Sequence, residues 1–374
     1  MPDLRISASA LHIPLKTSFK QASSVRDTGE STWVVARRGD VEGYGEGCPR
    51  PYVTGETVTG ALVWAKQQLA SLQKQVTDVT SLFSWMEERR AEIDRNPAAF
   101  CALETALLDL FAQERGQSIE ALLGLSEPEG VYQYTAVVGD GDARKFSGLI
   151  QRYLEWGFTD FKLKVNGDLA KDQQKLSSLV EAANARGLPN IRVRLDANNL
   201  WAGQETVAIT YLKQLSGPFL GIEEPIAPLK AAALSRISTT LNQAIILDES
   251  LCTRQNLLEY DALPGLFIAN LKVSRLGGVL RSLELVKLLR ERNWPIIVGA
   301  HVGETSVLTR AGMLVARAAA DQLLAQEGAF GTILLDYDPL SPSLRFGAAG
   351  RLDLREYKFN KTTGWGLTLV DPPD

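Results

Sequence analysis

The pattern of apolar and polar positions changes along the chain, and its first part predicts a mixed domain of strands and helices. Residues 4–15 alternate with the period of two that is typical of a half-buried strand, and Trp33–Ala36 and Val41–Gly47 add two further strands. Strands this close in sequence predict an antiparallel meander. Over Thr57–Leu125 the apolar period becomes helical. We therefore expect residues 1–127 to form one α+β domain.

After Gly130, short apolar runs alternate with amphipathic helical segments such as Asp168–Arg186 and Leu280–Arg292. The runs that we expect to be buried strands are Tyr132–Val138, Asp160–Val165, Ile191–Asp196, Phe219–Glu223, Ile245–Asp248, Phe267–Lys272, Ile296–His301 and Thr332–Asp336. Strands that each precede a helix are typical of an α/β barrel of parallel strands. A doubly wound open sheet is the alternative, and the absence of a GxGxxG motif after a strand disfavours it. Residues 128–343 are expected to form the barrel, and the turn-rich residues 344–374 to return to the first domain.

The predicted barrel strands, from the second onwards, each end on an ionisable side chain. In chain order these side chains are Lys164, Asp196, Glu223, Asp248, Lys272, His301 and Asp336. Neighbours in this series are separated by about one strand–helix unit. Because barrel enzymes build their active sites at the carboxyl ends of the strands, we expect these side chains to meet at one mouth.

The strand at residues 161–165 is the most informative of the series. Its alternation places Lys162 and Lys164 on one face and three apolar side chains on the other. Buried ammonium groups are costly unless an anion or a reaction requires them, although a solvated edge strand would show the same pattern. Lys272, four strands further on, is expected to face Lys164 across the mouth. Such an opposed pair suits proton transfer, and the alternative is that Lys272 snorkels at the rim.

Three carboxylates on adjacent predicted strands, Asp196, Glu223 and Asp248, form a candidate metal site. Converging carboxylates repel one another without a cation, and hard oxygen ligands suit Mg²⁺, with Mn²⁺ as an alternative ion. Asn198 and Glu249 lie close to them in the sequence and are expected to orient the ligands. The alternative is a structural role, in which the carboxylates form salt bridges to nearby lysines.

Composition restricts the class of protein. With 45% hydrophobic and 22% charged residues among 374, the chain has the balance of an ordinary soluble globular protein. A net charge of −4 with scattered basic residues predicts no nucleic-acid partner. The sequence has no apolar run long enough for a membrane span and no signal-peptide pattern, so we expect a cytoplasmic protein. Cys48, Cys101 and Cys252 lack the spacing of a disulfide framework or a thiolate metal site.

Five motifs together resemble those of the enolase superfamily and, more narrowly, of its muconate lactonizing enzyme subgroup. They are Phe161-Lys-Leu-Lys-Val165, Arg194-Leu-Asp-Ala-Asn198, Ile222-Glu-Glu-Pro225, Leu247-Asp-Glu-Ser250 and Asn270–Gly278. The resemblance covers nearly the whole chain and implies a capping domain beside a (β/α)7β modified TIM barrel. It also implies that the three carboxylates bind Mg²⁺ and that Lys164 and Lys272 form the acid/base pair, with Lys162 stabilising charge. Barrels of this family are often symmetric homo-oligomers.

The resemblance implies removal of the proton α to a carboxylate through an enediolate, a step shared by epimerases, dehydrating synthases and cycloisomerases. Asp336-Tyr337-Asp338 is similar to the Asp-x-Asp pair with which dipeptide epimerases bind an ammonium group, and a solvated turn before Pro339 is the alternative. We expect epimerisation of a small-molecule carboxylate, either a dipeptide or an N-acyl amino acid. The alternatives are β-elimination, cycloisomerisation and a barrel that binds ligands without catalysis.

His301 departs from the subgroup's pattern, in which the seventh strand ends without a histidine. Because an unperturbed histidine titrates near pH 6.5, we interpret His301 as a substrate contact or auxiliary group, and a plain pocket wall is the alternative. Phe19, Arg26 and Tyr52 fall in cap segments that correspond to the family's specificity loops. They are the remaining candidate substrate contacts, although exposed arginines are in most proteins simply solvated.

Overall fold

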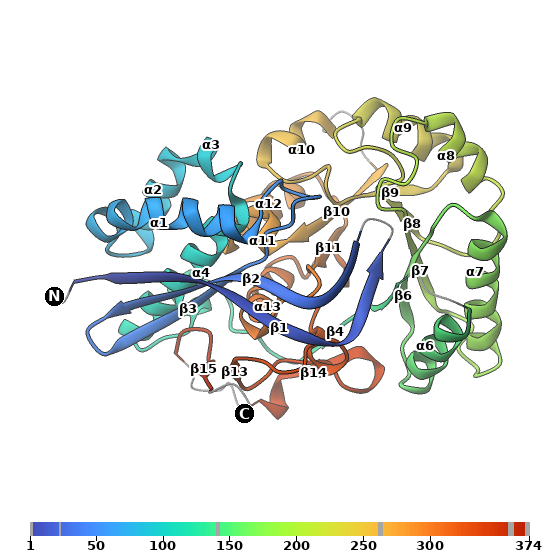
Figure 1. Cartoon of the computed structure of the whole chain (residues 1–374). Coiled ribbons are helices and arrows are strands. Elements are labelled where there is room, and N and C mark those ends of the chain that lie inside the picture. Colours follow the sequence, from blue (N-terminus) through green and yellow to red (C-terminus); the bar gives the residue numbers. More distant parts are fainter. Residues whose placement is uncertain (1–2, 22–23, 140–142, 261–264, 358–362, 371–374) are drawn as a thin grey trace.

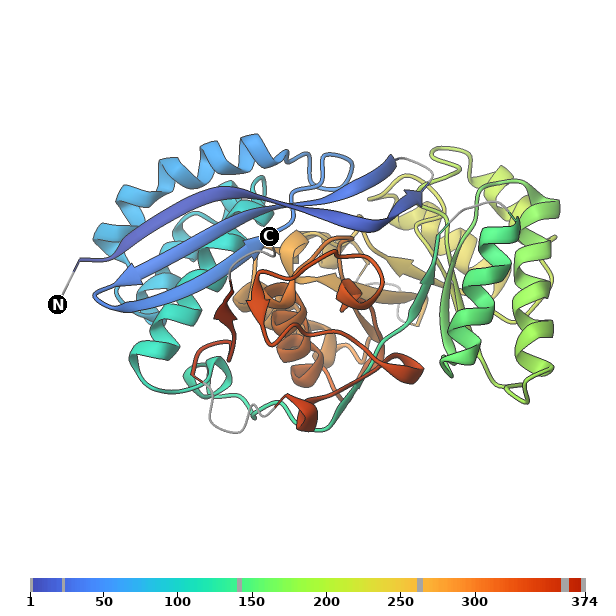
Figure 2. The same ribbon diagram turned by 60° about the horizontal axis from the view of Figure 1, so that its bottom comes forward.

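The computed structural model describes residues 3–21, 24–139, 143–260, 265–357 and 363–370. An N-terminal cap of antiparallel strands and helices lies beside a barrel of parallel strands (Figure 1). Figure 2 shows the long first strands of the cap running across the molecule towards the green helices at the right-hand edge. The expected architecture, a modified TIM barrel with an α+β cap, is confirmed.

The cap sheet has the strand order β1–β2–β3. Its strands are β1 (Arg5–Gln21), β2 (Ser24–Arg38) and β3 (Val41–Gly47), and the cap helices are α1 (Val58–Gln75), α2 (Val79–Glu88), α3 (Arg90–Ile93), α4 (Pro97–Glu114) and α5 (Ile119–Leu122). The first two strands are longer than the sequence predicted. Their pairing resumes at Phe19 and Arg26 after an irregularity that follows Pro14, and this extends both strands beyond the alternating segments.

Alternate glycines in β3 allow the buried helix α4 to lie directly against the cap sheet. Gly43, Gly45 and Gly47 share one face of the strand, and a Cβ atom at each of them would overlap a carbonyl oxygen of α4. All residues of α4 from Pro97 to Ala112 are buried, because its other side packs against the short helix α11 (Val273–Leu276) of the barrel. The cap and the barrel therefore share α4 as a common layer.

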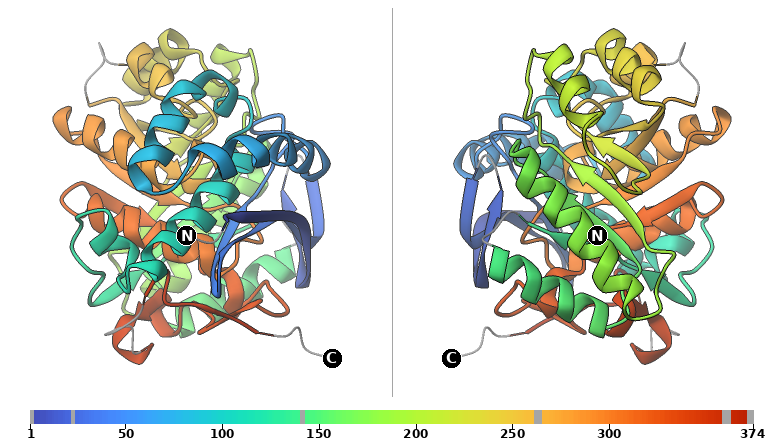
Figure 3. Two further views of the ribbon diagram at one scale, coloured as in Figure 1. Left: turned by 90° about the vertical axis from the view of Figure 1, so that its left-hand side faces the viewer. Right: turned by 90° about the vertical axis from the view of Figure 1, so that its right-hand side faces the viewer.

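The barrel sheet has eight parallel strands in the order β5 to β12. They are β5 (Ala136–Val138), β6 (Asp160–Lys164), β7 (Arg192–Asp196), β8 (Gly221–Glu223), β9 (Ala244–Leu247), β10 (Phe267–Lys272), β11 (Ile296–Gly299) and β12 (Leu323–Gln326). The other barrel helices are α6 (Ala143–Glu155), α7 (Leu169–Asn184), α8 (Glu205–Leu212), α9 (Ala231–Leu241), α10 (Arg254–Tyr260), α12 (Val279–Glu291) and α13 (Ser306–Ala318). The backbone N–H of Thr135 donates to the carbonyl of Gln326 over 2.8 Å and links the two ends of the sheet. Figure 3 shows the helices on the outside of this curled sheet.

The prediction of the eighth barrel strand at Thr332–Asp336 is wrong. The strand is β12, Leu323–Gln326, and a 3₁₀ turn, η1 (Phe330–Thr332), follows it. Both segments are short and apolar, so the local pattern does not distinguish them. Long-range pairing decides between them, because Ile296 of β11 pairs with Leu323.

The C-terminal segment contacts both parts of the molecule. Its elements are β13 (Leu340–Ser341), η2 (Ala348–Gly350), β14 (Arg351–Asp353), η3 (Leu354–Glu356) and β15 (Thr368–Leu369). Strand β14 pairs antiparallel with β4 (Val131–Gln133), so the single strand predicted over residues 132–138 is divided into β4 and β5. Further on, the backbone N–H of Trp365 donates to Asp109 of α4 over 2.8 Å.

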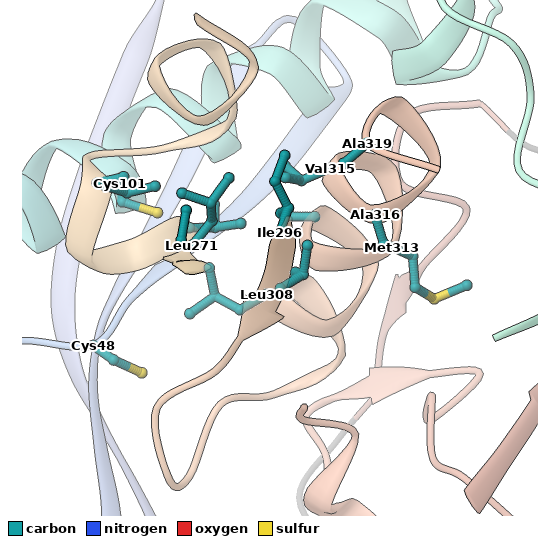
Figure 4. Close-up of a cluster of buried hydrophobic side chains, with 14 of the residues drawn as sticks. Cys48, Cys101, Leu271, Ile296, Leu308, Met313, Val315, Ala316 and Ala319 are labelled. Carbon is teal, nitrogen blue, oxygen red and sulfur yellow. The ribbon is translucent and has the colours of Figure 1, made fainter. Parts of the chain in front are cut away.

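One continuous hydrophobic core joins the cap to the barrel. Figure 4 shows Cys48 and Cys101 of the cap in a cluster with Leu271 of β10, Ile296 of β11 and Leu308 of α13, and all five side chains are buried. The three cysteines of the chain are free thiols. None of the helices in the described parts of the chain has the length and apolar character that crossing a bilayer requires.

Candidate active site

Strand register brings the predicted polar side chains to one level of the barrel. Lys164 pairs with Asp196 across β6 and β7, and Asp196 pairs with Glu223 across β7 and β8. Asp248 follows directly after β9, and Lys272 is the last residue of β10. A pocket at this end is lined by these lysines, by both aspartates and by Tyr52 and Val53 of the cap.

Lys162 is buried and surrounded by several carboxylates. Its Nζ atom is 2.7 Å from Oε1 of Glu223, 3.1 Å from Oε2 of Glu327 and 3.5 Å from Oδ2 of Asp196. Burial alone would lower the pKa of Lys162, but the charges of Glu223, Glu327 and Asp196 outweigh it and raise that pKa above its ordinary value. Lys162 therefore remains an ammonium group, which suits the stabilisation of negative charge and not the removal of a proton.

Lys164 contacts Asp196 and Asn198. Its Nζ atom lies 2.8 Å from Oδ2 of Asp196 and also donates to Oδ1 of Asn198, whose backbone N–H donates back to Asp196 over 3.0 Å. Burial opposes ionisation of Asp196, but the ammonium groups of Lys164 and Lys162 lower its pKa below the ordinary value. Asp196 is therefore an ionised carboxylate held in a fixed orientation.

Lys272 lies on the opposite side of the mouth from Lys164. Strands β6 and β10 are four places apart in the order of eight, which in a closed barrel is half the circumference. The Nζ atom of Lys272 is 2.7 Å from Oδ2 of Asp248, and Arg275 contacts the other oxygen of the same carboxylate. Each of the two lysines thus approaches the pocket from its own side, paired with its own aspartate.

The carboxylates at this level fit a divalent cation. Oε2 of Glu223 and Oε2 of Glu249 are buried and have no hydrogen-bond partner within the described residues. Burial, followed by the neighbouring charge of Glu224, raises the pKa of Glu249 to about 7. A cation would satisfy such unpaired oxygens, and an all-oxygen set suits Mg²⁺. The described residues contain no group of three carboxylate, histidine or cysteine side chains at metal-binding spacing. Lysine ammonium groups contact Asp196, Glu223 and Asp248, and none contacts Glu249 among the described residues.

Glu224 positions the segment that follows β9. Its carboxylate accepts the backbone N–H groups of Asp248 and Ser250, both over 2.7 Å, and the hydroxyl of Ser250 over 2.9 Å. Sequence reasoning missed this buried glutamate. The signal available in the sequence is the second carboxylate of Glu223-Glu224. Glu224 lies directly after β8 with a positive φ of 38°, so the chain turns there and its side chain points away from the predicted metal ligand Glu223.

Glu327 is a member of the site that sequence reasoning missed. It follows β12, lines the pocket and binds Lys162, and its other oxygen lies 3.5 Å from Nη2 of Arg194. Burial would raise the pKa of Glu327, but Lys162 and then Arg194 lower it. The sequence signal is its place directly after the apolar run at Leu323–Ala325, which forms most of the last strand.

Asp336 and Asp338 do not lie at the end of the eighth strand, as the sequence predicted. Asp336 is exposed, and neither residue is among those that line the pocket. Oδ2 of Asp338 accepts the backbone N–H of Ser306 over 3.1 Å and its hydroxyl over 2.7 Å, and Oδ1 accepts the N–H of Leu340. Asp338 therefore fixes the start of α13.

His301 lies two residues after β11 and lines the pocket, with a side chain that is almost fully buried. Its backbone N–H donates to Glu304 over 2.6 Å. Burial and then the charges of Lys272 and Arg50 lower the pKa of His301 well below 6.5. The imidazole is therefore neutral at physiological pH, and it lines the pocket as an uncharged polar group.

Tyr52 of the cap lines the pocket, and Arg26 lies directly behind it against its ring. Tyr52 is 42% exposed, and the guanidinium of Arg26 lies 5.6 Å from the centre of its ring. Phe19 pairs with Arg26 through the backbone of β1 and β2. The side chain of Phe19 lies outside the described part of the structure.

Comparison with known proteins identifies the family. Residues 145–371 match the sequence model of the enolase C-terminal domain-like family. The chain belongs to this family. A relative, the hydrophobic dipeptide epimerase of Enterococcus faecalis, is 25% identical over 365 residues, which are 94% of this chain and 97% of the relative.

Two solved structures share the family fold. The dipeptide epimerase from Enterococcus faecalis, complexed with Mg and the dipeptide L-Leu-L-Tyr, has a TM-score of 0.81 at 22% identity and covers 98% of this chain and 99% of that chain. The N-succinyl Arg/Lys racemase from Bacillus cereus has a TM-score of 0.84 at 20% identity, with coverages of 98% and 96%. The expected membership of the enolase superfamily is confirmed, and so is the class of enzyme, an isomerase of the racemase and epimerase type.

Proposed function

We propose that this enzyme moves a proton at the carbon α to a carboxylate and so epimerises a dipeptide or an N-acyl amino acid. The observation that carries the proposal is the placement of Lys164 and Lys272, on strands that lie half a barrel apart, at the two sides of one pocket. A single base returns a proton to the face from which it came, whereas two opposed groups can remove it from one face and deliver it to the other.

The residues of the chain divide the chemistry among them. One of the two lysines, as a neutral amine, removes the α-proton, and the ammonium group of the other donates a proton to the opposite face. Lys162 remains charged beside Glu223 and Asp196, where it stabilises the negative charge that develops on the substrate carboxylate. The reverse reaction exchanges the roles of the two lysines.

Asp196, Glu223 and Asp248 would hold Mg²⁺, with Asn198 and Glu249 orienting the ligands. When bound, the ion supplies Lewis-acid stabilisation of the charge that develops on the substrate. The unpaired buried oxygens of Glu223 and Glu249 support this assignment, as does the similar Enterococcus faecalis structure, which is complexed with Mg and a dipeptide. Mn²⁺, which takes similar oxygen ligands, is the expected substitute.

The names of the similar proteins support both substrate classes. The Enterococcus faecalis relative is named for hydrophobic dipeptides, and the Bacillus cereus structure for N-succinyl arginine and lysine. In both classes the reacting carbon lies between a carboxylate and an amide nitrogen. His301 and Tyr52 line the pocket, and Arg26 lies beside Tyr52, so these three are the proposed contacts for the remainder of the substrate.

Deuterium exchange tests the proposal. The Mg²⁺-loaded enzyme is incubated in D₂O with pools of L,L-dipeptides and of N-acyl-L-amino acids, and products are analysed by mass spectrometry and chiral chromatography. We expect α-deuterium in the product together with the inverted stereocentre. Turnover of a hydroxy acid by β-elimination, without exchange in either pool, would refute epimerisation.

A further inference from the structure

The charges in and around the pocket distinguish between the two proposed substrate classes, dipeptides and N-acyl amino acids. Because it chooses between these classes, the inference rests on the proposed function. A dipeptide carries a free ammonium group in addition to its α-carboxylate, whereas an N-acyl amino acid does not. A site for an ammonium group requires a carboxylate without a cation of its own, because a buried charge is stable only when it is paired.

Most carboxylates that line the pocket already have a lysine partner. These pairs are Asp196–Lys164, Asp248–Lys272 and Glu327–Lys162, with N–O distances of 2.8, 2.7 and 3.1 Å. Among the described lining residues only Glu249 lacks such a partner, and it follows directly on the proposed metal ligand Asp248. An ammonium group in the pocket would therefore meet three lysines, and the one lining carboxylate left to it would be Glu249, which the proposed metal site also uses to orient its ligands.

The acidic pair that the sequence suggested for this purpose is absent from the pocket lining. Asp338 is fully engaged at the start of α13, where Ser306 and Leu340 donate to its two oxygens. Asp336 is exposed beside the cap strand β1, and its backbone N–H donates to Pro14 over 3.0 Å. The structure thus removes the observation that favoured a substrate ammonium group.

The cap side of the pocket is cationic. Nε of Arg26 is buried without a hydrogen-bond partner in the described chain, and the carboxylate of Glu30 is 4.0 Å from its guanidinium. Within the described residues the buried Arg50 donates hydrogen bonds to backbone carbonyls, among them that of Val302 over 2.7 Å, and these do not neutralise its charge. Both arginines, with Lys272, contribute to the lowered pKa of His301. An anion, and not a cation, is favoured at this side.

We propose that the substrate is a dianion without a free ammonium group, whose second anionic group lies against Arg26 beside Tyr52. The guanidinium offers paired donors that match a carboxylate, and the partly exposed ring of Tyr52 covers the apolar part of the same group. Two sources share this chemistry. The second carboxylate belongs either to a dicarboxylic acyl group on the nitrogen or to an acidic side chain on the reacting amino acid.

Binding of analogues that lack an α-proton tests the inference separately from turnover. Calorimetry on the Mg²⁺-loaded full chain compares N-succinyl-α-aminoisobutyrate and N-acetyl-α-methylglutamate, which are dianions, with N-acetyl-α-aminoisobutyrate and glycyl-α-aminoisobutyrate. We expect one dianion to bind at least about tenfold more tightly than the N-acetyl monoanion, and the zwitterionic glycyl compound to bind most weakly. The tighter dianion identifies the source of the second carboxylate. Tightest binding of the glycyl compound, or dianions no tighter than the monoanion, would overturn the inference.

Variants at Arg26 make the test specific. Arg26→Gln should raise the Kd of the tighter-binding dianion about tenfold, which removes its advantage over the N-acetyl monoanion. The Kd of the monoanion should change by less than about twofold. Arg26→Lys should restore part of the advantage. Arg37→Gln is the matched control, because Arg37 lies at the other end of β2 with an exposed side chain, and it should change neither value. A dianion advantage that survives Arg26→Gln would refute the assignment.

Exchange and binding experiments together distinguish a failure of the proposed function from a failure of this inference. Tight binding of a dianion, with no α-deuterium exchange in its reactive counterpart N-succinylalanine or N-acetylglutamate, would refute epimerisation alone. Exchange that is fastest with glycylalanine would support epimerisation and refute the dianion.

Discussion

Lys162 of β6 and Glu327 after β12 form an ion pair of 3.1 Å that spans the seam at which the barrel closes. The short strand β5 lies between the strands that carry them, and Arg194 also approaches Glu327 at 3.5 Å. Lys162 is the residue that we propose stabilises the charge of the transition state, and Glu327 holds it to the last strand of the barrel. We therefore expect this ion pair to affect both the stability of the fold and catalysis.

Replacing Glu327 should destabilise the fold. In Glu327→Gln the buried charges of Lys162 and Arg194 lose a partner, and we expect the free energy of unfolding to fall by about 3 kcal/mol. Urea denaturation followed by circular dichroism measures the change. Glu129→Gln is the control, because it removes an exposed pair with Arg317 that contributes at most about 1 kcal/mol. Equal, small effects of the two substitutions would contradict the structural role of Glu327.

Both opposed lysines should be indispensable for epimerisation. Lys164→Ala and Lys272→Ala each remove the group that serves one face of the reacting carbon, and we expect kcat for epimerisation to fall by at least about 10²-fold to 10⁴-fold. Chiral chromatography of the product measures it. Lys171→Gln, at an exposed position on α7, should retain full activity. Full activity in either catalytic variant would refute the two-base mechanism.

Mg²⁺ should bind to and stabilise the folded chain. A ligand that binds only the native state raises the melting temperature, so titration of the chelated protein with Mg²⁺ should raise Tm in a concentration-dependent way. Glu223→Gln removes a ligand together with its unpaired oxygen, and it should abolish most of this shift. An unchanged Tm on addition of millimolar Mg²⁺ would contradict the metal site.

Stability should fall as the pH rises from about 5 to about 8. Burial raises the pKa of Glu46 and Glu104 to about 7 and that of Glu304 to about 8. Above pH 4.5 the unfolded chain releases these protons while the native state still binds them, so each group lowers stability by up to about 1.4 kcal/mol per pH unit. The loss ends when the native carboxyls also ionise. Urea midpoints at pH 5.5 and pH 8 measure the trend.

Glu104→Gln provides the internal control for that trend. The amide keeps an oxygen that can accept the backbone N–H groups of Val279 and Leu280 at the start of α12, but it does not titrate. The dependence on pH should therefore be shallower in this variant than in the parent. An identical slope would show that Glu104 is already ionised in the native state.

Asp338 should affect stability and leave substrate binding unchanged. Asp338→Asn weakens the hydrogen bonds that Ser306 donates at the start of α13, and loss of a hydrogen bond of this kind costs about 1 kcal/mol. Thermal denaturation measures this cost, and KM for the exchanged substrate should stay constant. A large rise in KM without loss of stability would restore the ammonium-binding role that the sequence first suggested.

Most of the site could be predicted from local pattern. Lys162 and Lys164 alternate on one strand, and Asp196, Glu223 and Lys272 are the last residues of their strands, as predicted. Helix α7 also begins as expected, because Asp168 caps its first turn. These features depend on neighbours within a few residues, so one sequence is enough to predict them.

The sequence alone thus determined the class of fold, the family and the strand ends at which lysines and carboxylates lie. Tertiary structure decided which segment completes the barrel, and with it the roles of Glu327 and Asp338. Leu323–Gln326 and Thr332–Asp336 have similar local character, and only the first pairs with β11 and joins Thr135 across the seam. It also decided that His301 is neutral among cations. Pairing and burial depend on residues far apart in the chain, and local periodicity contains no information about them.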